Sequence, residues 1–185
     1  MKRGLQIFFV ALSALTLAAA TAGAQSASWR QVVGIQLASN SVGAGTGAVP
    51  GGFLPWTTID GAARVNLRTG EIKFAVRGLV FAAGGPGITI GTPGPITGVK
   101  GVLVCDVDGS ASGGNSVLVE TPSVRLSATG DAAFVGNLGS LPAVCSSQAD
   151  LAFLVRASVF GGNSVEGPWI ANGAVLSRNH DRDDH

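Results

Sequence analysis

Two cysteines, Cys105 and Cys145, have the most narrowly defined chemistry in this chain. In an exported protein an even number of cysteines indicates a disulfide, whereas a thiol nucleophile or a metal site requires a histidine nearby. Both histidines, His180 and His185, lie at the C-terminal end of the sequence. We therefore predict a Cys105–Cys145 disulfide, which would close a loop of about 40 residues and stabilise the fold by roughly 4 kcal/mol.

Carboxylates are the second group that could support chemistry. Asp106 and Asp108 are followed by Gly109, a pattern with some features of a calcium-binding loop. Calcium requires about six to eight oxygen ligands, and an EF-type loop carries a glutamate at its last ligand position, where this chain has Val117. We therefore interpret the segment as an ordinary polar turn that follows a strand.

A hydrolytic site is difficult to assemble from the remaining residues. A serine hydrolase requires a histidine held by the fold, and a glycosidase requires two facing carboxylates. The other acidic candidates fall mostly at expected strand ends or turns, where a solvated charge is the usual role: Asp60, Glu71, Glu120, Asp131, Asp150 and Glu166. We assign no catalytic residue and expect no cofactor.

The C-terminal tail combines His180 and His185 with three aspartates. Such a segment can chelate a transition metal weakly, but nothing packed around it would fix the ligand geometry. We therefore predict a disordered polar tail over residues 178–185 and assign no metal site.

Two segments rich in glycine and proline, 42–56 and 82–98, are longer than ordinary connections between strands. The first carries Phe53 and Trp56. These aromatic rings could fold back onto the edge of the core or form an exposed contact surface, since ordered loops on a rigid scaffold often carry function. Phe53 and Trp56 are our candidate contact residues.

The N-terminal residues resemble a secretory signal. Lys2 and Arg3 precede an uncharged apolar run over 5–20, and small residues occupy 22–24. The run is shorter than the roughly 20 residues that a membrane span needs. We predict a signal peptide over 1–24, which makes the protein secreted or periplasmic, with no stable membrane span after cleavage.

Composition and charge limit the possible partners of the mature chain. The precursor has a formal charge of +1, and loss of the two signal-peptide cations leaves a mature charge of −1. The sequence contains no run of lysine or arginine, so nucleic acids and anionic membranes have no electrostatic support as partners. Low charge with abundant glycine, valine and alanine is typical of an extracellular β domain, which we place at 25–177.

The clearest structural signal is a pair of alternating apolar runs, 63–67 and 72–76, on either side of Thr69-Gly70. A period of two predicts strands with one buried face, and glycine at the crease permits a tight hairpin. If the loop is limited to Thr69-Gly70, then residue 65 pairs with 74 and residue 63 pairs with 76.

Other segments show the same period or continuous apolar character. The segment 123–138 has a second hairpin pattern, and 151–160 favours a strand over a short helix. Further strands are expected over 31–37, 99–107, 116–120, 124–128, 132–138, 151–160 and 168–177. Together these segments predict an all-β fold, an antiparallel β-sandwich of about eight or nine short strands in two sheets. A closed β-barrel is the alternative.

Several short motifs occur in a fixed order along the chain. They are Leu54-Pro55-Trp56, Gly78-Leu79-Val80, the segment 91–95, the strand that ends at Cys105, Gly130-Asp131-Ala132, Leu141-Pro142 and the segment 168–171. Together they resemble a group of uncharacterised secreted bacterial proteins, which implies export and a compact β domain but no activity. The hairpin at 61–80 is faintly similar to CHRD-type β modules, although this chain lacks the histidine-containing strand of those modules.

These observations favour a secreted, non-enzymatic β-sandwich that has a binding or structural role at the cell envelope or outside the cell. Its partner would be an unidentified protein or polymer. Two alternatives stay open: a carboxylate-dependent hydrolase that acts on an envelope polymer, and a module that binds a small ligand between its sheets.

Overall fold

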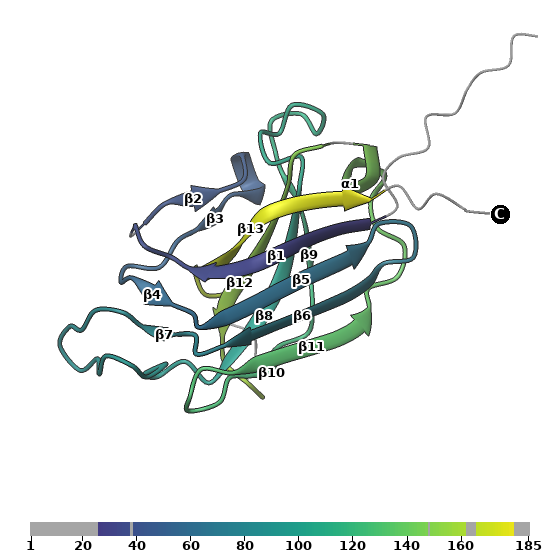
Figure 1. The fold of residues 1–185 in the computed structure, drawn as a ribbon. Helices are drawn as coiled ribbons and strands as arrows, with labels where there is room; N and C mark the ends of the chain where they lie inside the picture. Colours follow the sequence, from purple (N-terminus) through teal and green to yellow (C-terminus); the bar gives the residue numbers. More distant parts are fainter. Residues whose placement is uncertain (1–25, 38, 148, 162–165, 180–185) are drawn as a thin grey trace, which may run out of the picture.

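The computed structural model describes residues 26–37, 39–147, 149–161 and 166–179 (Figure 1). The predicted signal peptide and the histidine-containing end of the tail lie outside these ranges. The elements in chain order are β1 (Ser26–Gly34), β2 (Ser41–Val42), the short 3-10 helix η1 (Gly45–Gly47), β3 (Val49–Pro50), β4 (Trp56–Thr57), β5 (Asp60–Asn66), β6 (Glu71–Arg77), β7 (Val80–Phe81), β8 (Gly98–Cys105), β9 (Val117–Glu120), β10 (Val124–Arg125), β11 (Ala132–Asn137), α1 (Ala143–Ser147), β12 (Leu151–Ser158) and β13 (Trp169–Asn179).

The all-β prediction is confirmed. Nine strands form one large sheet in the order β10-β8-β12-β13-β1-β5-β6-β11, with β9 paired to β8. Two small sheets, β2-β3 and β4-β7, lie at one end of it (Figure 1). All of these strand pairs are antiparallel.

The large sheet curls, so that strands β8 and β12 face strands β1 and β6 across the core. The ring of Phe153 on β12 lies 5.6 Å from that of Trp29 on β1 and 5.6 Å from that of Phe74 on β6. The two facing layers of a sandwich are therefore present, but as two halves of one sheet that is continuous through the β13–β1 pair. Among the described pairings, the end strands β10 and β11 are not joined to each other.

The central hairpin forms, but its predicted register is wrong by two residues. Val65 pairs with Ile72 and not with Phe74. The turn is longer than two residues because Asn66 closes it: the Asn66 Oδ1 atom accepts two loop N–H groups, each at 3.0 Å, and its carbonyl accepts Gly70 N–H at 2.9 Å. A shift of two residues keeps every side chain on its predicted face, so the predicted burial pattern holds.

The second predicted hairpin, 123–138, is wrong in its pairing. Its turn does form, since Ser127 N–H donates to the carbonyl of Asp131 at 2.9 Å. However, β10 pairs with β8 and β11 pairs with β6, at opposite ends of the sheet order. The turn thus links the two edges of the curled sheet, because each strand finds a better partner far away in the sequence.

Strand β12 is buried on both faces, as the continuous apolar run 151–160 predicted. Phe153 points into the core, whereas Leu154 and its partner Val102 on β8 point the opposite way and are also fully buried. The β2–β3 segment is tied to the adjoining strand β13, where Trp169 Nε1 donates to the carbonyl of Asn40 at 2.9 Å.

The first and last strands are longer than predicted. Strand β1 begins at Ser26, although we expected the strand at 31–37, and β13 continues to Asn179. The predicted tail therefore begins two residues too early. Ser26 pairs with Asn179 at the ends of these strands, so pairing between the first and last strands supplies the order that their polar local sequence does not indicate.

Asp131 gives the turn between the sheet edges a testable pH dependence. Its carboxylate accepts hydrogen bonds from Thr129 Oγ1 at 2.8 Å and from Gly78 N–H at 3.0 Å. The Thr129 bond, followed by the Gly78 bond, lowers the pKa of Asp131. A carboxyl whose pKa is lower in the folded state stabilises that state above its unfolded pKa of about 3.9, and this contribution disappears as the pH falls through the folded pKa.

We therefore expect Asp131→Asn to lower Tm at about pH 7 and the difference from wild type to shrink as the pH approaches about 2. Thermal unfolding followed by circular dichroism at several pH values measures this difference. Thr129→Val, which removes one donor, should show a smaller effect with the same sign. A difference that stays constant from neutral to acidic pH would contradict the assignment.

Candidate functional site

The cysteines form the predicted disulfide. The Cα atoms of Cys105 and Cys145 are 4.8 Å apart, and the bond attaches helix α1 to the end of strand β8. Both residues are fully buried. Their role is therefore to hold α1 against the sheet.

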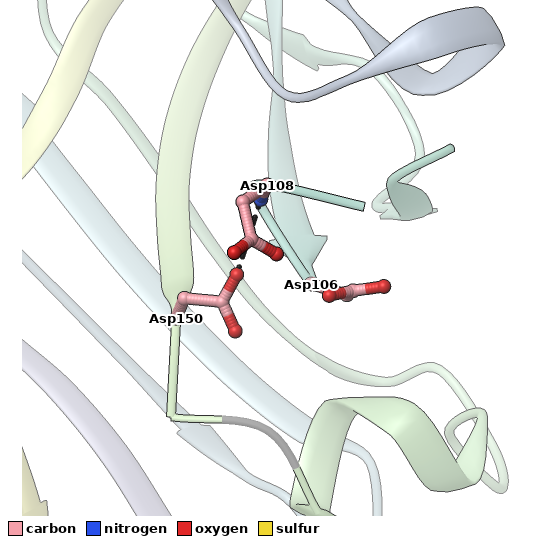
Figure 2. A group of neighbouring side chains, drawn as sticks. All are labelled: Asp106, Asp108 and Asp150. Carbon is pink, nitrogen blue, oxygen red and sulfur yellow. Dashed lines mark hydrogen bonds between the residues drawn. The ribbon is translucent and has the colours of Figure 1, made fainter. Parts of the chain in front are cut away.

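Three aspartates gather close to this disulfide, where β8 ends and β12 begins (Figure 2). Asp106 directly follows Cys105 and Asp150 directly precedes Leu151, and Cys105 and Leu151 are antiparallel partners. One carboxylate oxygen from each of Asp106, Asp108 and Asp150 lies within 4.8 Å of the others. The sequence pattern identified Asp106 and Asp108 as neighbours but missed Asp150, because its placement depends on the pairing of β8 with β12.

The hydrogen bonds of this cluster close the turn that follows β8. Asp106 is buried at a positive φ of 55°, and its Oδ2 atom accepts Ala111 N–H at 3.0 Å. Asp108 Oδ1 accepts Ser110 N–H at 2.9 Å, and Asp150 Oδ2 accepts Asp108 N–H at 3.1 Å. These contacts agree with the interpretation of the segment as a polar turn.

Hydrogen bonds from Ser110 favour the charged form of Asp108 in this cluster. The Ser110 N–H bond, followed by the Ser110 hydroxyl, lowers the pKa of Asp108. Carboxylate oxygens are the ligands that hard cations such as calcium prefer, but calcium takes about six to eight of them. Three aspartates supply only part of such a set, and backbone N–H groups already use oxygens of each residue.

The other acidic candidates do not join this cluster in the described parts of the chain. Glu120 accepts Arg156 Nη1 at 2.7 Å and Lys100 Nζ at 3.2 Å, in a partly buried ion-pair network. Asp60 and Glu71 are exposed at opposite ends of the β5–β6 pair.

The two segments rich in glycine and proline meet at one end of the molecule, where β4 pairs with β7 (Figure 1). The Trp56 and Phe81 rings are 4.0 Å apart, and Ala82 N–H donates to the carbonyl of Pro55 at 2.9 Å. These contacts bring the segments 42–56 and 82–98 into one surface, which we call the loop end.

The structure separates the two candidate contact residues. Trp56 is only 2% exposed, as in the alternative in which its ring folds back onto the core, and it borders the apolar hollow described below. Its backbone N–H donates to the carbonyl of Ile35 at 2.7 Å, and its ring packs on Phe81 inside the loop end. Phe53 is 83% exposed. The local sequence could not separate them, because burial of Trp56 depends on the pairing of β4 with β7.

A shallow apolar hollow of about 190 Å³ lies beside Phe53. Leu54, Ile96, Pro168 and Ile170 are among the residues that line it. The hollow joins the loop end to β13, and neither its lining nor Phe53 carries a charge. This arrangement can accept an apolar or aromatic group.

Comparison with protein-family models, curated proteins and solved structures found no match. Within the described residues, no helix has the length and apolar character to cross a membrane.

Asp106 provides a test of the turn-closing role. We expect Asp106→Ala to lower the free energy of unfolding by about 1–3 kcal/mol, because it removes a buried carboxylate that accepts the Ala111 N–H and closes the turn. Asp106→Asn should cost less, since asparagine retains an acceptor oxygen and tolerates a positive φ. Urea denaturation measures both. An equal loss in Asp108→Ala, which alters an exposed residue, would contradict a special role for Asp106.

Proposed function

We propose that this chain is an exported, non-enzymatic β module that binds a protein or polymer partner through its loop end, at the cell envelope or outside the cell. The observation that carries the proposal is the exposed ring of Phe53 next to the apolar hollow. Aromatic residues beside apolar pockets supply much of the binding energy in many interfaces.

The backbone around Phe53 supports this role because it is held on both sides. Gly52 N–H donates to the carbonyl of Trp169 at 2.9 Å, and the carbonyl of Gly52 accepts Ser39 N–H at 3.0 Å. Two residues after Phe53, the carbonyl of Pro55 accepts Ala82 N–H. A ring presented by an ordered loop loses less conformational entropy on binding than a ring on a free segment.

Two other roles receive less support. A carboxylate-dependent hydrolase needs acids that border a groove, whereas the converging Asp106, Asp108 and Asp150 are not among the residues that line the hollow beside Phe53. A small ligand between the facing layers would compete with Trp29, Phe74 and Phe153, whose packed rings occupy that space.

Comparison of Phe53→Ala with Trp56→Ala tests the proposal. Phe53→Ala should leave Tm within about 2 °C of wild type, because exposed substitutions rarely change stability by more than about 0.5 kcal/mol. Trp56→Ala should cost about 3–5 kcal/mol because it removes a buried ring. Affinity capture from the host's envelope and medium, quantified by mass spectrometry, should show partners that wild type retains and Phe53→Ala loses.

Val175→Ala is the matched control, since Val175 is also an exposed apolar side chain but lies on β13 and is not among the residues that line the hollow beside Phe53. It should retain the same partners as wild type. Unchanged capture by Phe53→Ala, or equal losses in both variants, would contradict the proposal.

A further inference from the structure

The outer face of β5 and β6 carries two like charges directly opposite each other. Arg64 on β5 pairs with Lys73 on β6, and both side chains are exposed. Neither makes an ion pair with any carboxylate in the described ranges. Like charges in direct cross-strand contact destabilise a sheet, so this position carries two positive charges that no ion pair in the described residues neutralises.

The surface is hollowed on both sides of this pair. A cavity of about 530 Å³ extends from Arg64 and Lys73 towards Val135 and Asn137 on β11. A second cavity, of about 330 Å³, extends from the same two residues towards Arg30 on β1. Arg64 and Lys73 line both cavities, which adjoin on the outer face of β1, β5, β6 and β11, about 14 Å from the first to the last strand axis. We call the two adjoining cavities the trough.

The residues along this trough suit a hydroxylated, negatively charged chain. Ala62 and Ala75 contribute short side chains to the part near β1, which leaves room above the sheet. Asn66 and Asn137 contribute side-chain amides at the other end, next to Glu71. The Oδ1 atoms of both amides already accept loop N–H groups, so their Nδ2 groups can donate to sugar hydroxyls. The two cations can bind a carboxylate from both sides.

We propose that this trough binds an acidic polysaccharide, with a sugar carboxylate seated between Arg64 and Lys73. A peptide that adds to the sheet could not lie between Arg64 and Lys73, because β1, β5 and β6 each have partners on both sides and, of the strands under the trough, only β11, at the end of the sheet, has a free side. Single-stranded nucleic acid binds by stacking on exposed aromatic rings, and the only aromatic lining residue among those described for the trough is the buried Trp29.

The trough shares none of its described lining residues with the hollow beside Phe53. Binding at the trough is therefore independent of binding at the loop end. The net charge of the chain does not indicate this site, because it sums the charges of the whole surface, whereas Arg64 and Lys73 lie together on one face.

The test measures binding of oligogalacturonate, a carboxylated sugar chain, by isothermal titration calorimetry at about 50 mM salt, with neutral dextran as the uncharged comparison. The double variant Arg64→Gln/Lys73→Gln should weaken binding about tenfold or more, as expected for loss of hydrogen bonds to a charged group. Its Tm should stay the same or rise, since the like-charge contact is removed. Glu71→Gln should strengthen binding, because it removes a negative charge from the trough.

Arg125→Gln is the matched control. Arg125 is exposed on β10, where its guanidinium lies 4.9 Å from the centre of the Phe160 ring. It is not among the residues that line either cavity of the trough. This variant should change the affinity by less than about twofold, and Phe53→Ala should leave it unchanged. Three results would overturn the proposal: no measurable binding by the wild type, equal weakening by Arg125→Gln and the double variant, or tighter binding of a single-stranded oligonucleotide of matched charge.

Discussion

The packing of Phe153 between Trp29 and Phe74 is the contact on which the rest of this structure depends. It holds the two halves of the curled sheet together across the core. The backbone opposite these rings has no room for side chains: a Cβ atom at Gly101 would lie 2.8 Å from the Phe74 ring, and one at Gly173 would lie 2.5 Å from Trp29. Glycine is therefore required at both positions for the strands to approach the rings so closely.

Pairing between β1 and β13 joins the two halves that this contact holds together into one continuous sheet. Strand β1 lies between β13 and β5, so the first and last strands of the domain are neighbours at its centre. The connecting segments lie at the two ends of the strands. The β2–β3 and β4–β7 pairs lie at one end, and α1 with its disulfide lies at the other (Figure 1). A rigid centre with held loops suits a module that presents side chains to a partner without moving.

The sequence predicts local properties of this fold well and non-local ones poorly. Period-two alternation correctly assigned the faces of β5 and β6, and cysteine number correctly assigned the disulfide. The partners of β10 and β11, the meeting of Asp150 with Asp106, and the burial of Trp56 all depend on pairings between distant segments. Local propensity carries no information on such pairings, since each strand selects its partner by tertiary packing.

The register of the central hairpin differs from the predicted one by two residues, and this difference decides which charged side chains pair on the outer face. With a turn limited to Thr69-Gly70, Arg64 would pair with Ala75, and no like charges would meet there. The observed turn closes on Asn66, which moves Lys73 opposite Arg64. The buried face is unaffected because the shift is an even number of residues. The Asn66 side chain therefore leaves the core unchanged but sets the register that brings Arg64 opposite Lys73. The positive pair on the outer face is thus a consequence of the turn.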